Sequence, residues 1–148
     1  MNIRTAIHSE HSIIVDFQIR MAKETEDMGL NTDTVNKGVE SVLNDHNKGI
    51  YYVAERDDKV IASLLTTYEW SDWRNGMVLW IQSVYVLPEY RGQGVYKEMY
   101  LYLKAKVTND TALLGLRLYV EKDNINAQKV YQKLGMDGEH YKMYEWFA

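Results

Sequence analysis

The chain has 148 residues, 46% of them hydrophobic and 26% charged, with a formal net charge of −4 and no cysteine. This size and composition predict a single globular domain, residues 1–148. Nucleic-acid binding is not expected from an acidic chain without a Lys/Arg cluster, and the absence of cysteine excludes disulfides, thiolate metal sites and a cysteine nucleophile. The first residues do not resemble a signal peptide and no long apolar run follows, so we expect a soluble, cytoplasmic protein without membrane contact.

The first third of the chain is expected to form a strand and two helices. Residues 2–7 favour a short strand, and Ser9 is a candidate N-cap for a helix that ends near Gly29. Asn31, Thr32 or Asp33 can cap a second helix, which ends near Asp45. Both helices are recognised by apolar residues at helical spacing: Ile14, Phe17, Met21 and Met28 in the first, and Val35, Val39, Val42 and Leu43 in the second.

Three strands follow as an antiparallel meander. Residues 50–55 and 60–70 are rich in β-branched and aromatic side chains and are separated by the polar turn 56–59. The turn-forming segment 71–76 then leads into a long strand, residues 77–87.

After the third strand of the meander, the pattern changes from strand to helix at the glycines of residues 91–94. Residues 113–120 predict a further strand, and the next helical pattern is ended by Gly135. A last strand, HYKMYEWF (residues 140–147), is expected to close the chain. The element order βααβββαβαβ predicts an α/β (α+β) fold with a mixed sheet and helices on its faces.

The segment Arg91-Gly92-Gln93-Gly94 stands where a strand gives way to a helix. Glycines at a helix N-terminus let backbone N–H groups approach an anion such as a phosphate. The segment matches neither a P-loop nor a dinucleotide fingerprint, because the residues that those motifs require are absent. A plain strand–turn–helix junction is the alternative interpretation of the same residues.

Two motifs together resemble the GNAT superfamily of N-acetyltransferases. Arg91 and Gly94 match the first and fourth positions of its acetyl-CoA signature, [Q/R]-x-x-G-x-[G/A], whereas Tyr96 stands where the signature has Gly or Ala. A second motif, N-x-x-A-x-x-x-Y-x-x-x-G, is present downstream, and its fixed positions here are Asn124, Ala127, Tyr131 and Gly135.

This resemblance implies a mixed, mostly antiparallel sheet of six to seven strands flanked by about four helices, with acetyl-CoA as co-substrate. In the family the glycine turn holds the CoA diphosphate and the preceding strand pairs with the pantetheine arm. The cofactor-binding residues implied are Val84, Tyr85, Val86, Arg91, Gly92, Gln93, Gly94, Val95, Tyr96 and Asn124. From the residues alone, Asn124 can equally be the N-cap of its helix.

Acetyl transfer needs a deprotonated amine and an acid for the departing thiolate. Tyr131 occupies the position that many family members use as the acid, although its place on an apolar helical stripe also suits packing. The candidates for the base are Glu69, at the end of the middle strand of the meander, and Glu24 or Glu26 on the first helix. Glu24, Glu26 and Trp70 are candidates for the acceptor site, with a solvated helix face or a packed aromatic as the alternatives. Without cysteine, direct attack within a ternary complex is favoured over an acyl-cysteine intermediate.

The expected function is therefore transfer of an acetyl group to a primary amine of a small molecule or a protein. A non-catalytic acyl-CoA-binding module and a preference for a longer acyl chain are the alternatives. The four histidines show no ligand spacing, so no metal site is expected. The final strand has aromatic residues on both faces, which would suit pairing in a homodimer.

Overall fold

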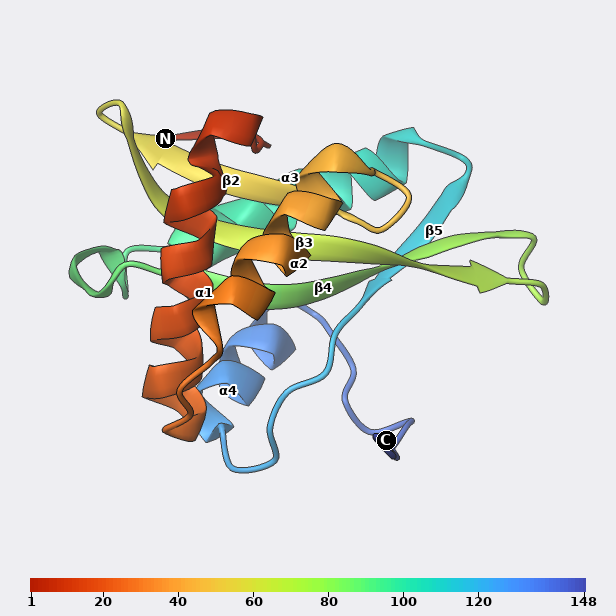
Figure 1. Cartoon of the computed structure of the whole chain (residues 1–148). Coiled ribbons are helices and arrows are strands. Elements are labelled where there is room, and N and C mark those ends of the chain that lie inside the picture. Colours follow the sequence, from red (N-terminus) through yellow and green to blue (C-terminus); the bar gives the residue numbers. More distant parts are fainter. The chain divides into compact units, whose positions relative to one another are not determined.

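The computed structural model describes all 148 residues, and Figure 1 shows its elements in chain order. The elements are β1 (Asn2–Thr5), the 3-10 turn η1 (His8–Glu10), α1 (His11–Glu26), α2 (Thr32–Asn44), β2 (Ile50–Arg56), β3 (Lys59–Ser71), β4 (Gly76–Val86), the 3-10 turn η2 (Pro88–Tyr90), α3 (Val95–Asn109), β5 (Leu113–Arg117) and α4 (Ile125–Lys133). The chain divides into two compact units, Met1–Arg117 and Leu118–Ala148, and each is described by itself. The single domain expected from the sequence stays a prediction.

The first unit contains one five-stranded sheet of order β1-β2-β3-β4-β5. The strands β1 to β4 pair antiparallel, and β5 lies parallel to β4, so the mixed, mostly antiparallel sheet is confirmed. In Figure 1, α1 and α2 lie on the face of the sheet turned toward the viewer and α3 lies on the opposite face. The four expected helices are present, whereas the expected six to seven strands are a wrong prediction.

The strand predicted at residues 140–147 is absent, because residues 141–148 have no regular secondary structure and pair with no strand. Alternating side chains give a segment the pattern of a strand, but a strand also needs a neighbour for its backbone groups. The strand predicted at 113–120 likewise ends at Arg117, and with it ends the pairing to β4.

The start of α1 differs from the prediction that Ser9 caps it. Ser9 lies within η1, and α1 begins only at His11, with Glu10 in the N-cap position. The cap of α2 is confirmed as Asn31, whose Oδ1 accepts a hydrogen bond from the backbone N–H of Thr34 at 2.9 Å.

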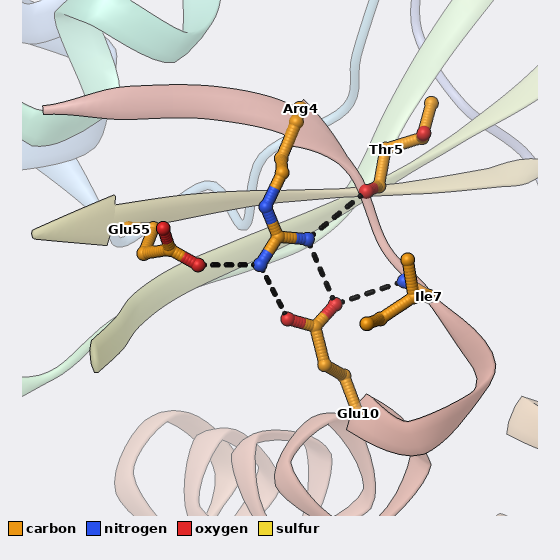
Figure 2. Close-up of polar contacts among 5 residues, drawn as sticks. All are labelled: Arg4, Thr5, Ile7, Glu10 and Glu55. Atoms are coloured by element: carbon orange, nitrogen blue, oxygen red, sulfur yellow. Dashed lines mark hydrogen bonds and ion pairs between the residues drawn. The ribbon is translucent and has the colours of Figure 1, made fainter. Parts of the chain in front are cut away.

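Glu10 instead joins three segments of the first unit, as Figure 2 shows. Its carboxylate accepts hydrogen bonds from both terminal nitrogens of Arg4 on β1, at 3.1 and 2.7 Å, and from the backbone N–H of Ile7 at 2.9 Å. The Arg4 guanidinium also donates to Glu55 on β2. We call these three charged side chains, Arg4, Glu10 and Glu55, the Arg4 cluster. It fixes η1, and with it the start of α1, to the β1 edge of the sheet.

The helices pack on the sheet through the apolar faces that the sequence predicts. Ile14 and Val39 are fully or almost fully buried and meet Tyr51 of β2, with the other predicted apolar residues of α2 packed around them. On α3, Met99 and Leu103 are completely buried. This packing fixes α1 and α3 relative to β4. The glycine turn lies between β4 and α3.

Candidate cofactor and active site

The last part of β4 pairs with no strand on its β5 side. Strand pairing between β4 and β5 extends from Met77 to Trp80, and beyond it the paired residues of β4 (Ile81, Gln82, Tyr85 and Val86) pair only with β3. One extra residue bulges β4 within this stretch, because Ser63 and Leu65 of β3 oppose Tyr85 and Gln82. Ser83 in the bulge has a φ of +52°, which is unusual for a residue other than glycine.

The direction of the free backbone groups follows from one hydrogen bond at the end of β4. The N–H of Leu87 donates to the carbonyl of Ile61 on β3 at 2.9 Å, and successive residues of a strand direct their backbone groups to opposite sides. The N–H and C=O groups of Val86 and Val84 are therefore directed away from β3, toward the unpaired side. The carbonyl of Val86 accepts a hydrogen bond from Nε of Arg91 at 2.9 Å.

The glycine turn connects this strand end to α3. Gly92 and Gly94 have φ values of +73° and +78°, and a Cβ atom at either position would meet nothing within 4 Å. Glycine is therefore required for its backbone conformation and not for space. Gly94 is the N-cap of α3, and no side chain caps this helix end.

The side chain of Gln93 is engaged within the protein. Its Oε1 accepts from Arg56 on β2 at 2.9 Å, and its Nε2 donates to the carbonyl of Glu89 at 2.9 Å. Gln93 thus braces the turn against η2 and the β2–β3 hairpin. Gln93 is one of the predicted cofactor-binding residues, and the group that it offers to a ligand is its backbone N–H.

Glu24 of α1 meets the strand end and the glycine turn together. Its carboxylate accepts from the hydroxyl of Tyr85 at 2.9 Å and from the guanidinium of Arg91 at 2.6 Å. The guanidinium also lies over the Tyr85 ring, 5.3 Å from its centroid. We call Glu24, Tyr85 and Arg91 the Arg91 cluster. It borders a cavity of about 260 Å³ that is lined by Met21, Glu24, Thr25, Val84, Tyr85, Val86 and Arg91.

The protonation states within the Arg91 cluster follow from its contacts. Burial alone would raise the pKa of Glu24, but the hydrogen bonds from Arg91 and Tyr85 outweigh it and hold the pKa below its ordinary value. Burial and the hydrogen bond to Glu24 raise the pKa of Tyr85. At neutral pH the cavity is thus bordered by a carboxylate, a neutral phenol and a guanidinium.

Glu69, the predicted base, lies in a separate set of contacts on β3. Its two oxygens accept hydrogen bonds from Nε1 of Trp80 on β4 and from the guanidinium of Arg117 on β5, both at 2.7 Å. These hydrogen bonds lower the pKa of Glu69. Such a carboxylate holds a proton weakly, and its role as a base stays a prediction.

The remaining predicted acceptor residues of the first unit are exposed. Glu26 is the last residue of α1, and Trp70 lies near the end of β3 with 59% of its surface exposed. Trp73, in the turn between β3 and β4, is 90% exposed. No contact in the structure joins these three side chains, so an acceptor site that includes Glu26 and Trp70 also stays a prediction.

In the second unit, the predicted cap of α4 is confirmed. Oδ1 of Asn124 accepts a hydrogen bond from the backbone N–H of Ala127 at 3.1 Å. Tyr131 lies on α4, where burial raises the pKa of its phenol. The phenol is thus protonated at neutral pH, as an acid must be. The roles of Tyr131 in catalysis and of Asn124 in cofactor binding stay predictions.

The structure thus brings Val84, Tyr85, Val86, Arg91 and Glu24 to one cavity. Met21 and Thr25 also line this cavity, although neither is among the site residues predicted from the sequence. Their signal is helical spacing: residues 21, 24 and 25 lie on one face of α1, and Met21 already belongs to its apolar stripe. None of the helices is long and apolar enough to cross a membrane.

Comparison with known proteins identifies the relatives of this chain. The family described as "Acetyltransferase (GNAT) family" matches residues 16–136. A crystal structure of "a possible acetyltransferase" from Clostridium difficile 630 is 46% identical, with a TM-score of 0.94 over 99% of this chain and 97% of that one. No curated protein matches.

Two more distant structures share the fold. One described as "a probable acetyltransferase" is 22% identical, with a TM-score of 0.86 over 100% of this chain and 98% of that one. The other, from Clostridium acetobutylicum, is described as a "predicted acetyltransferase with acetyl-CoA". It is 20% identical, with a TM-score of 0.75 over 97% of this chain and 95% of that one.

Proposed function

Because the chain belongs to the GNAT family of acetyltransferases, we propose that it transfers the acetyl group of acetyl-CoA to a primary amine of a small molecule or a protein. One observation carries the proposal: β4 loses its β5 neighbour where a glycine turn opens α3. An extended, amide-containing arm would require an unpaired strand end, and a diphosphate would require an uncapped helix start.

The pantetheine arm would pair with the unpaired side of β4. Val84 offers an N–H and a C=O on this side, and Val86 offers its N–H, since its carbonyl already accepts from Arg91. The diphosphate would lie against the turn from Arg91 to Tyr96, where the α3 dipole and the Arg91 charge favour an anion. The acetyl-CoA named for the Clostridium acetobutylicum protein is consistent with this placement.

The chemistry would be direct attack in a ternary complex. The amine nitrogen forms a bond to the thioester carbonyl carbon, the carbon–sulfur bond breaks, and the CoA thiolate takes a proton from the phenol of Tyr131. The proton on the attacking nitrogen passes to a base. Only about one amine in 10³ is neutral at pH 7 when its pKa is near 10.4, so a base must also take a proton from the ammonium before the nitrogen can attack.

Glu69 is the acceptor that the sequence predicts, and its ionised carboxylate would take the proton directly or through water. Its contacts with Trp80 and Arg117 lower its proton affinity, and a base is most effective when its pKa lies near the working pH. A Glu69→Gln variant tests this role. If Glu69 is the base, kcat falls about 10²-fold; an unchanged kcat removes Glu69 from the mechanism.

An amine panel incubated with acetyl-CoA tests the proposed function, with free thiol as the readout. We expect thiol release above the hydrolysis background with at least one amine, and an acetylated product of the matching mass. Calorimetry with acetyl-CoA is the companion measurement. Binding without turnover across the panel would indicate a non-catalytic acyl-CoA module, and no binding at millimolar acetyl-CoA would contradict the cofactor site itself.

A further inference from the structure

The guanidinium of Arg91 is held by three groups of the first unit. Its Nε donates to the carbonyl of Val86 at 2.9 Å, and its Nη2 donates to a carboxylate oxygen of Glu24 at 2.6 Å. The guanidinium also lies over the ring of Tyr85, 5.3 Å from the centroid. The positive charge of Arg91 is thus already paired with the negative charge of Glu24.

Glu24 takes the place that an anionic ligand of Arg91 would need. Arginine binds carboxylates and phosphates through the same N–H groups and with similar short hydrogen bonds. A diphosphate at the glycine turn would therefore require the charge that the Glu24 carboxylate holds. Two anions beside a single guanidinium also repel each other. The carboxylate and the diphosphate are thus competitors for Arg91.

We propose that Glu24 is an internal competitor of the cofactor, so that binding of acetyl-CoA transfers Arg91 from the Glu24 carboxylate to the diphosphate. This inference rests on the proposed function, because it takes the diphosphate site at the glycine turn as given. Glu24 acts through Arg91 and is a positioning residue. Its effect is to lower the affinity of the protein for acetyl-CoA.

The Glu24 carboxylate keeps other partners when Arg91 leaves it. Arg91 binds Oε2, whereas Oε1 accepts a hydrogen bond from the hydroxyl of Tyr85 at 2.9 Å. Arg20 lies four residues before Glu24 on the same face of α1, and its positive charge also acts on Glu24. Glu24 borders the cavity described above, where water can solvate the released oxygen. The exchange therefore leaves no buried charge without a partner.

The other two contacts of Arg91 do not compete with an anion. The carbonyl of Val86 binds Nε, and the ring of Tyr85 lies against the face of the guanidinium. Both contacts can persist during the exchange, so they keep Arg91 beside the turn. Its two terminal nitrogens then provide the fork with which arginine binds the oxygens of a phosphate group.

Calorimetry with acetyl-CoA tests the competition. Glu24→Gln keeps the size of the side chain and removes its charge. An ion pair at a protein surface contributes up to about 1 kcal/mol, so this variant should bind acetyl-CoA about fivefold more tightly than wild type. The matched control is Asp33→Asn, which removes one negative charge from an ion pair with Lys37 on α2. It should change the affinity by less than about twofold, because salt screens distant charges.

The same measurement in an Arg91→Met background shows whether Glu24 acts through Arg91. Without the guanidinium there is no partner to compete for, so Glu24→Gln should no longer tighten binding. An equal gain in both backgrounds would show that Glu24 acts as a general negative charge, which overturns the proposal. An unchanged affinity of Glu24→Gln in the otherwise wild-type chain overturns it as well.

A crystal structure of the wild-type chain with bound acetyl-CoA tests the exchange directly and needs no variant. Nη2 of Arg91 should lie within about 3 Å of a diphosphate oxygen and more than about 4 Å from the Glu24 carboxylate. An intact pair between Arg91 and Glu24 beside a bound diphosphate would overturn this inference and leave the cofactor site standing. If neither wild type nor Glu24→Gln binds millimolar acetyl-CoA, the cofactor site fails and the inference fails with it.

Discussion

Two arginines of this protein form ion pairs with carboxylates, and the surroundings of the two differ. In the Arg4 cluster, Arg4 binds Glu10 and Glu55, and the Glu10 side chain is only 9% exposed. In the Arg91 cluster, Arg91 binds Glu24 with both side chains well exposed, at 46% and 38%. The first cluster is enclosed by the segments it joins, whereas the second borders a cavity.

The difference shows how the same ion pair serves structure or binding. Breaking an enclosed pair leaves a buried charge that water cannot reach, which is costly. An exposed pair contributes little to stability, because water solvates either partner when the other is removed. The charge of Arg91 is therefore available for a ligand without risk to the fold, and that of Arg4 is not.

Replacement of Arg4 is expected to have the largest effect on stability. Arg4→Met leaves Glu10 buried with the N–H of Ile7 as its remaining hydrogen-bond donor, so the free energy of unfolding should fall by about 3 kcal/mol. Chemical denaturation measures this, and calorimetry on the folded variant should give an unchanged dissociation constant for acetyl-CoA. The double variant Arg4→Met/Glu10→Gln removes the buried charge and should recover part of the loss. If Arg4→Met unfolds as easily as wild type, the cluster does not stabilise the fold.

Replacement of Tyr131 is expected to have the largest effect on catalysis, because neither arginine cluster carries the proton transfer. Tyr131→Phe removes the phenol proton and should lower kcat about 10²-fold, with little change in KM for acetyl-CoA. Steady-state kinetics with the best amine of the panel measures this. Tyr68→Phe, on β3, is the control and should keep wild-type kcat. An unchanged kcat for Tyr131→Phe would leave Tyr131 with a packing role.

Gly94 tests the turn beside the Arg91 cluster. Gly94→Ala places a residue with a Cβ in the left-handed region of backbone conformation, which costs about 1–2 kcal/mol. The turn can lower this cost only if its backbone conformation changes. We expect a loss of stability of about 1 kcal/mol and a roughly 10-fold weaker binding of acetyl-CoA by calorimetry. Gly29→Ala is the control, since Gly29 has no positive φ and a Cβ there meets nothing within 4 Å. Equal binding by the two variants would contradict the role of the turn.

Arg91 is the direct counterpart of Arg4. Arg91→Met should change the free energy of unfolding by less than about 1 kcal/mol, yet weaken acetyl-CoA binding by about 10-fold. The matched control is Lys37→Met, which removes one positive charge from an exposed ion pair with Asp33 on α2. It should change neither quantity. A loss of stability as large as that of Arg4→Met would remove the contrast between the clusters.

The pH dependence of stability is the smallest expected effect. Burial alone would raise the pKa of Glu10, but the hydrogen bonds from Arg4 and from the N–H of Ile7 lower it below its ordinary value of 4.5. The unfolded chain thus takes up the proton first, so Glu10 stabilises the fold above pH 4.5 and this contribution is lost as the pH falls. Denaturation curves at a series of acidic pH values should show a smaller decline for Glu10→Gln than for wild type. Parallel declines would contradict this sign.

The sequence predicted those features that depend on neighbouring residues. The helical spacing of Val35, Val39 and Val42 predicted the buried face of α2, and Asn31 was among its predicted caps. The change of period at Gly94 predicted where β4 gives way to α3. Each of these signals lies within about one or two helical turns, so the chain itself carries it.

Only the tertiary structure decided which distant residues meet. Glu24 is 61 positions from Tyr85 and 67 from Arg91, and no local pattern shows that these residues meet. The bulge at Ser83 and the pairing of Glu69 with Arg117 likewise depend on register between strands. The strand predicted at residues 140–147 shows the same limit. Alternating side chains make a segment suitable for a strand, but the strand forms only where a neighbouring strand edge pairs with its backbone.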